Sequence, residues 1–155
     1  MTSKTPIRRL LIANRGEIAV RVARAAREMG IAALGVYSQA DADAYHLRFM
    51  DDARCIGPAP AAESYLRGDA IIAAAVDMQA DAVHPGYGFL SERAAFAQAC
   101  IDAGLIWVGP SPQAMAAMGS KIDAKHRVRE SKVQRCRVTT ARISRRRVCA
   151  RKPQG

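Results

Sequence analysis

A short stretch near the middle of the chain, "AVHPGYGFLSE", places residues with binding chemistry directly after an apolar run. His84 precedes a proline, and Gly86 and Gly88 flank Tyr87. The glycines allow backbone angles that other residues avoid, which suits either a tight turn or a close approach to a ligand. Because the proline forces His84 into an extended conformation, a structural role in the turn is favoured for this histidine over catalysis.

Two further turns carry polar residues after apolar runs. "NRGE" follows the run Ile7–Ala13, and "VGPSP" follows the run Leu105–Trp107. Gly16 stands without the other glycines of a GxGxxG pattern, so it gives only weak support to a dinucleotide site. Arg15 and Glu17, on either side of Gly16, are predicted to pair with other turns on the same edge of the sheet.

Strands and helices alternate over about the first 120 residues, and these elements must position the three turns. Apolar runs predict strands within 7–13, 31–38, 54–56, 80–86 and 105–112. Helical spacing predicts helices within 18–29, 39–53, 68–79, 91–104 and 112–121. Asp69 and Ser91 are the predicted N-caps of two helices, and Gly30 and Gly104 the predicted stops.

This alternation predicts an α/β domain, with a parallel sheet that has helices on both faces in a Rossmann-like arrangement. Right-handed crossovers place the carboxyl ends of the strands along one edge of the sheet. Ligands bind along that edge in such folds. The three turns are therefore expected to lie together where a ligand would bind.

The basic character of the chain is confined to its last thirty residues. Residues 1–125 hold 13 Lys or Arg and 13 Asp or Glu, whereas residues 126–155 hold the other 11 basic residues and one acid. This tail has no Phe, Tyr, Trp or Leu, so it is predicted to be disordered or weakly helical. Its arginines predict non-specific attraction to nucleic acid, without aromatic residues for base stacking.

Targeting signals are missing from the sequence pattern. The longest apolar stretches are far shorter than a bilayer span, and "MTSKTPIRR" lacks the apolar core of a signal peptide. No membrane association is therefore expected, and the expected location is the cytoplasm, or an organelle if the chain is made with a transit peptide. The four cysteines show no CxxC spacing and are predicted to be reduced.

Five segments in order resemble the N-terminal domain of biotin carboxylase: "LLIANRGEIAVRVARAAREMGI", "CIGPAPAAESYL", "AVHPGYGFLSE", "VGPSP" and "MGSK". This domain occurs in acetyl-, propionyl- and methylcrotonyl-CoA carboxylases and in pyruvate carboxylase. The resemblance implies the small α/β domain that precedes the ATP-grasp domains. The chain is therefore expected to comprise this domain over 1–125 and a non-globular, Arg-rich tail over 126–155 outside the family pattern.

The resemblance implies an ATP-dependent ligase that activates bicarbonate with MgATP and carboxylates carrier-bound biotin. A complete enzyme also has a biotin carboxyl carrier domain, a carboxyltransferase subunit and a homodimer mate. The ATP-grasp region does not follow here, and the change of composition at about His126 indicates a truncated or frame-shifted sequence. The chain alone is predicted to be inactive and to bind ATP, Mg²⁺ and biotin weakly. The alternative hypothesis is a non-enzymatic dimerisation module or a basic-tailed binding module.

The resemblance also assigns roles to single residues. Lys121 of "MGSK" is implied to contact the ATP phosphates, and Arg24 and Glu28 to reach across the homodimer. The loop implied to border the biotin pocket consists of His84, Gly86, Tyr87 and Gly88. No catalytic residue and no metal ligand is predicted within this chain.

Overall fold

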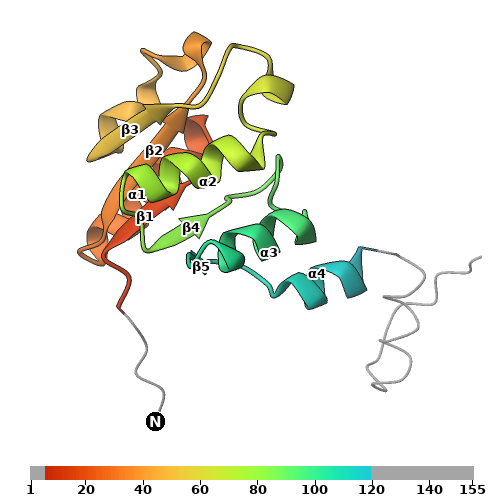
Figure 1. Ribbon diagram of the computed structural model, residues 1–155. Coiled ribbons are helices and arrows are strands. Elements are labelled where there is room, and N and C mark those ends of the chain that lie inside the picture. Colours follow the sequence, from red (N-terminus) through yellow and green to blue (C-terminus); the bar gives the residue numbers. More distant parts are fainter. Residues whose placement is uncertain (1–5, 120–155) are drawn as a thin grey trace, which may run out of the picture.

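The computed structural model describes residues 6–119, which form a five-stranded sheet (Figure 1). The strands are β1 (Arg9–Ile12), β2 (Ala32–Tyr37), β3 (Asp52–Cys55), β4 (Ala82–His84) and β5 (Ile106–Trp107). Their order in the sheet is β3-β2-β1-β4-β5, and all four neighbouring pairs are parallel. The predicted parallel α/β sheet is therefore confirmed, while the predicted basic tail lies outside the described residues.

Four α-helices and three short 3-10 helices connect the strands. The α-helices are α1 (Gly16–Glu28), α2 (Gly68–Asp77), α3 (Ala94–Asp102) and α4 (Pro112–Met118). The 3-10 helices are η1 (Gln39–Asp41), η2 (Tyr45–Phe49) and η3 (Ala61–Glu63). The connection from β2 to β3 therefore consists of two short 3-10 turns and not of one regular helix. None of the helices within residues 6–119 has the length and apolarity to cross a bilayer.

The strands bury side chains on both faces because helices cover both sides of the sheet. On one face, Leu10 and Ile12 of β1 pack in a core cluster with Ala19, Ala23 and Ala26 of α1. The three alanines recur at helical spacing and let α1 lie close to the strands. The prediction that helices cover both faces is thus borne out on this side by α1.

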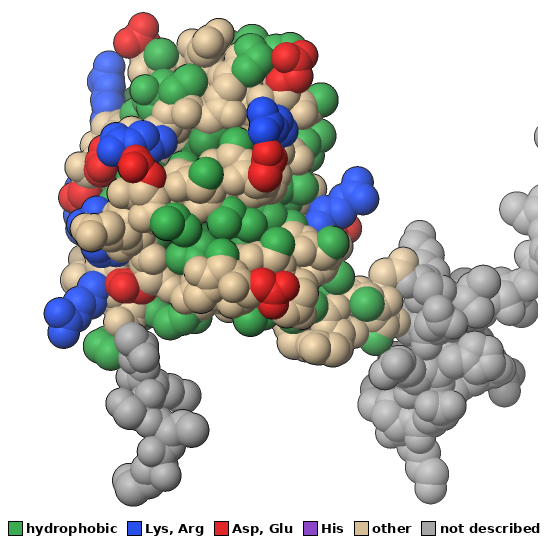
Figure 2. All heavy atoms as spheres, in the orientation of Figure 1, with side chains coloured by type: hydrophobic (Ala, Val, Ile, Leu, Met, Phe, Trp, Pro, Cys, Tyr) green, Lys and Arg blue, Asp and Glu red, His purple; other side chains and the backbone are tan. Residues whose placement is uncertain are grey.

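The opposite face is covered by α2 and α3, which lie in front of the sheet in Figure 1. Leu11 of β1 is fully buried there with Ile71 of α2 and Phe96 of α3. The outer sides of both helices carry single apolar side chains beside polar ones, since Val76 is 57% exposed and Ile101 is 43% exposed. Figure 2 shows such apolar side chains spread between the charged residues of this face.

The helix ends agree only in part with the predicted caps. Gly30 and Gly104 follow the ends of α1 and α3 with positive φ, as expected for helix stops. Asp69 does not cap α2, because it lies in the first turn and forms an ion pair with Arg67. Ser91 does not cap α3, because its amide donates to the carbonyl of Gly88 and the helix begins only at Ala94.

Candidate functional site

The candidate site lies at the carboxyl edge of the sheet, where the strand order reverses. From β1 the chain passes to β2 on one side, and it later returns to β4 on the other side of β1. Such a switch point separates the loops that follow the two strands and leaves a crevice for ligands. The turn that begins at Asn14 and the turn that begins at His84 meet at this point.

A buried asparagine joins these two turns. Asn14 is 1% exposed, and its Nδ2 donates to the carbonyl oxygens of Pro85 at 2.8 Å and Tyr87 at 2.9 Å. Its Oδ1 accepts from the amide of Arg15 at 2.9 Å. Asn14 was not predicted as a site residue, although a polar residue directly after a buried strand was a usable signal.

The two glycines of the second turn are required for different reasons. Gly86 has φ 66°, and a Cβ there would lie 2.6 Å from Cγ2 of Ile18 and 2.8 Å from Nδ2 of Asn14. Gly88 has φ 73°, but a Cβ would meet nothing within 4 Å. Gly86 therefore packs against α1 and the buried amide, whereas Gly88 serves only the backbone conformation.

His84 holds the turn to which it belongs. Its Nδ1 accepts from the amide of Gly86 at 2.9 Å, which assigns the proton of the neutral ring to Nε2. Burial lowers the pKa of His84, so the ring is neutral near pH 7. This contact lies within the turn itself, and the structural role favoured for His84 over a catalytic one stays a prediction.

Tyr87 is the exposed residue of the turn, with 57% of its surface accessible. Its hydroxyl donates to Oε1 of Glu17 in the first turn of α1, and this hydrogen bond raises the pKa of Tyr87. His84, Gly86 and Tyr87 together line one end of a groove of about 410 Å³ that runs along α1. The structure thus brings the predicted loop residues together beside an open, largely apolar space.

On the other side of β1, Asp41 collects hydrogen bonds from three elements. Its carboxylate accepts from the Tyr65 hydroxyl at 2.7 Å and the Ser38 hydroxyl at 2.8 Å, and it lies 3.5 Å from the Arg15 guanidinium. Burial alone would raise the pKa of Asp41, but these donors outweigh it and leave the pKa below its ordinary value. Burial, followed by the bond to Asp41, raises the pKa of Tyr65 to about 12.

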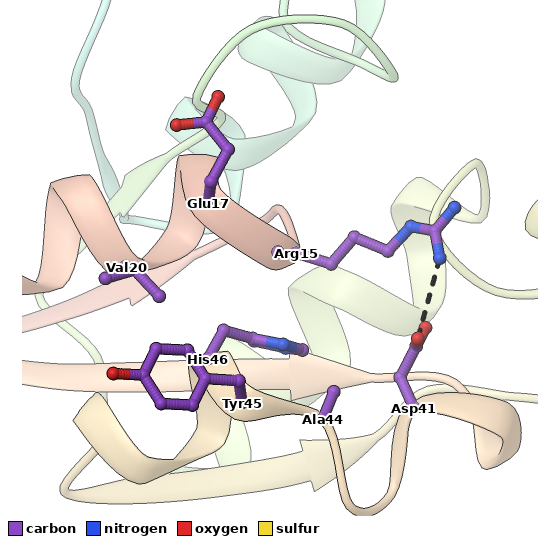
Figure 3. A pocket seen from close by; sticks show the side chains of 8 residues that line it. Arg15, Glu17, Val20, Asp41, Ala44, Tyr45 and His46 are labelled. Atoms are coloured by element: carbon purple, nitrogen blue, oxygen red, sulfur yellow. Dashed lines mark hydrogen bonds and ion pairs between the residues drawn. The ribbon is translucent and has the colours of Figure 1, made fainter.

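Arg15 links this network to the loop after β4. Its Cζ lies 5.5 Å from the ring centroid of Tyr65 and 5.9 Å from that of Phe89. The two rings are stacked with centroids 5.1 Å apart. Figure 3 shows the Arg15 side chain directed toward Asp41, while Glu17 points away from both. The prediction that Arg15 and Glu17 pair with neighbouring turns is confirmed.

The remaining predicted residues lie elsewhere. Arg24 and Glu28 are exposed on α1, away from the loop, and their role in a homodimer stays a prediction. Lys121 lies outside the described residues. Within residues 6–119, no group of three or more His, Cys, Asp or Glu is placed to hold a metal ion. Both cysteines of this part, Cys55 and Cys100, are free thiols.

Comparison with known proteins identifies the family to which this chain belongs. The family model described as "Biotin carboxylase, N-terminal domain" matches residues 6–115, well over half of the chain. The biotin-dependent acyl-coenzyme A carboxylase alpha3 subunit of Mycobacterium leprae is 54% identical over 120 residues, covering 77% of this chain and 20% of that protein. Biotin carboxylase 1 of Bacillus subtilis is 49% identical over 127 residues, covering 82% of this chain and 28% of that protein.

Solved structures give the same relationship. The crystal structure of a biotin carboxylase–β,γ-ATP complex from Campylobacter jejuni superposes with a TM-score of 0.80 at 48% identity, covering 83% of this chain and 29% of that one. The chain thus spans less than a third of the length of these relatives. Its sequence and fold place it in the family of biotin carboxylase N-terminal domains.

Proposed function

We propose that this chain supplies the first domain of an ATP-dependent biotin carboxylase, which carboxylates carrier-bound biotin with bicarbonate and MgATP for an acyl-CoA carboxylase. The observation that carries the proposal is the turn at residues 84–88, locked by Asn14 at the switch point of a biotin carboxylase N-terminal domain. Ligands of open α/β sheets bind in that place. The exposed ring of Tyr87 is proposed to form one wall of the biotin pocket.

The described residues contribute shape and rigidity to this pocket. Asn14 and His84 fix the backbone of the turn, and Glu17 restrains the hydroxyl of Tyr87. A wall held in one conformation reduces the entropy lost when a ligand binds. The ligand's orientation would then be set by the backbone around Gly86 and Gly88 and by the Tyr87 ring.

The remaining chemistry is proposed to reside in other parts of the enzyme. Biotin and ATP would be bound with the help of the segment that follows this domain in the longer relatives, together with Lys121 at the phosphates. Mg²⁺ is assigned to that segment as well, since residues 6–119 offer no cluster of ligands. A carrier domain, a carboxyltransferase subunit and a homodimer mate contacting Arg24 and Glu28 complete the proposed cytoplasmic assembly. The chain alone is accordingly proposed to be inactive.

A chimera tests this function directly. Residues 1–125 would replace the matching segment of Bacillus subtilis biotin carboxylase 1, and biotin-dependent ATP hydrolysis would be measured with bicarbonate and free biotin. We expect turnover within about tenfold of the parent enzyme, and none from the isolated chain. Tyr87→Ala in the chimera should raise the KM for biotin, whereas Tyr37→Ala, at the end of β2 and outside the groove beside Tyr87, should not. A folded but inactive chimera would reject the proposal.

The charge of residues 126–155 favours a second candidate function, a binding module with a basic tail. Lysine and arginine neutralise phosphates and release counterions, so such binding weakens as salt rises. A filter-binding titration with duplex DNA at several salt concentrations would measure that slope. If the slope disappears when residues 126–155 are deleted, the binding is simple electrostatic attraction. If sequence preference or salt-independent affinity persists, the binding module gains support.

A further inference from the structure

Phe89 directly follows the turn at residues 84–88 and has an unusual backbone conformation. Its φ is 41°, in the left-handed region that glycine adopts readily and bulky side chains avoid. The carbonyl of Gly88 accepts from the amide of Ser91 at 2.9 Å, so Phe89 takes the second position of a tight turn. A strained residue of this kind persists only where its surroundings hold it, and such residues cluster at functional sites.

The side chain of Phe89 is held by Tyr65, from the segment that precedes α2. Tyr65 is 1% exposed, and the two rings are stacked with centroids 5.1 Å apart and planes 12° apart. Tyr65 belongs to the core cluster beneath α2 and α3, and Phe89 packs against the same cluster. An aromatic stack favours one arrangement of its two rings over others. It therefore supplies a constraint that can keep the backbone of Phe89 left-handed.

The hydroxyl of Tyr65 connects this stack to the loop after β2. It donates to Oδ2 of Asp41 at 2.7 Å and accepts from the amide of Ser38 at 3.0 Å. Ser38 is 1% exposed, and its own hydroxyl donates to the same carboxylate oxygen at 2.8 Å. The Tyr65 ring is thus fixed at its hydroxyl by one loop of the carboxyl edge, while its face meets Phe89 in the other loop.

We propose that Tyr65 and Phe89 are positioning residues of the ligand-binding turn, whose stack keeps Phe89 left-handed and so sets the direction in which Tyr87 is presented. Only Gly88, with φ 73°, separates Tyr87 from Phe89. A glycine adopts many backbone angles, so Tyr87 needs a constraint beyond it. Asn14 already holds the carbonyl of Tyr87 on the near side. The identity of the ligand rests on the proposed function, whereas the coupling of stack and turn does not.

Simple filling of the core explains the stack less well. Phe96 belongs to the same core cluster and meets Trp107 edge-on at 5.6 Å, yet it has an ordinary helical backbone within α3. An aromatic pair can therefore be buried here without backbone strain. The strain at Phe89 is accordingly attributed to the turn that this residue closes.

Hydrogen exchange at the amide of Ser91, whose bond to Gly88 closes the turn, tests the coupling in the full chain. Tyr65→Leu and Phe89→Leu should each accelerate this exchange about threefold to tenfold, because both remove the stack. Phe89→Gly should accelerate it less than Phe89→Leu, since glycine adopts positive φ without strain. Phe49→Leu is the matched control, because Phe49 is also a partly buried phenylalanine in an aromatic pair but has the backbone of a 3-10 helix.

Two outcomes of this measurement would overturn the inference. One is a Phe49→Leu effect as large as that of Phe89→Leu, which would make the change at Ser91 a general consequence of lost stability. The other is a larger effect of Phe89→Gly than of Phe89→Leu, which would show that packing alone holds the turn.

The consequence for the ligand is measured in the chimera, through the KM values for biotin and for ATP. Tyr65→Leu should raise the KM for biotin about threefold to tenfold and leave that for ATP within about twofold, whereas loss of folded enzyme would lower kcat alone. Tyr65→Phe keeps the stacking ring and should restore the KM for biotin to within about twofold of the unsubstituted chimera. An unchanged KM for biotin in Tyr65→Leu would overturn the positioning role. An inactive unsubstituted chimera would reject the proposed function, while exchange at Ser91 would still decide whether the stack holds the turn.

Discussion

The two loops that flank β1 at the carboxyl edge of the sheet are held in different ways. Residues 84–88, after β4, are fixed from within by the buried amide of Asn14 and the ring of His84. Residues 39–49, after β2, present stacked rings and guanidinium groups on their exposed side. Buried hydrogen bonds cost much to lose, whereas exposed cation–π contacts contribute little. The first loop is therefore braced from beneath, whereas the second, anchored at Asp41, also displays side chains on its outer surface.

Asn14→Ala should have the largest effect, because it removes the group that joins two turns. The carbonyl oxygens of Pro85 and Tyr87 would lose their donor, and a small cavity would remain beneath the loop. We expect the free energy of unfolding to fall by about 3 kcal/mol in urea titrations. Gln98→Ala removes an exposed amide that bonds only within α3 and should cost less than about 0.5 kcal/mol. Equal losses in both variants would contradict the bracing role of Asn14.

Alanine substitutions at the two glycines of the same loop, Gly86 and Gly88, should differ in the stability that they remove. Gly86→Ala places a Cβ at positive φ and within 2.6 Å of Ile18, so it should destabilise the fold by about 2–3 kcal/mol. Gly88→Ala meets no neighbour and should cost about 1 kcal/mol from its backbone angle alone. Urea unfolding of both variants would measure these losses. A loss at Gly88 that matches the loss at Gly86 would show that packing against α1 is unimportant.

Each loop also contains a histidine, fully buried at His46 and half-buried at His84, which links the comparison to pH. Burial lowers the pKa of His46 and of His84, while in the unfolded chain both protonate near 6.5. As the pH falls below about 6.5, the unfolded state takes up protons first, so the free energy of unfolding decreases. His84→Asn and His46→Gln should each flatten the stability profile between about pH 7 and 5. A profile unchanged in both variants would exclude these rings as its cause.

The sheet and its edge could be predicted because their signals are local. Apolar runs and helical spacing mark β1, α1 and β4, and the parallel order follows from the crossovers between them. Asn14 could not be predicted as a site residue because its partners, Pro85 and Tyr87, are 71 and 73 residues away in the sequence. Such contacts are defined only by the pairing of β1 with β4.

The wrong N-caps have a similar origin. Ser91 has the residue type of a cap, but consecutive turns from Gly88 to Ser91 and from Leu90 to Arg93 use the chain before α3. Those turns place Phe89 on the ring of Tyr65. Stacking between distant segments thus outweighed the local preference of serine for a helix start.

Substitutions of two arginines, Arg24 and Arg9, should have the smallest effects on stability. Arg24→Gln removes only an exposed contact with Phe49 and should change the free energy of unfolding by less than about 0.5 kcal/mol. Arg9→Gln removes a half-buried guanidinium that donates twice to the carbonyl of Met78, so it should cost about 1 kcal/mol. Urea titration of both variants measures the difference. If Arg24 proved as costly as Arg9, its contact with Phe49 would belong to the framework that stabilises the fold.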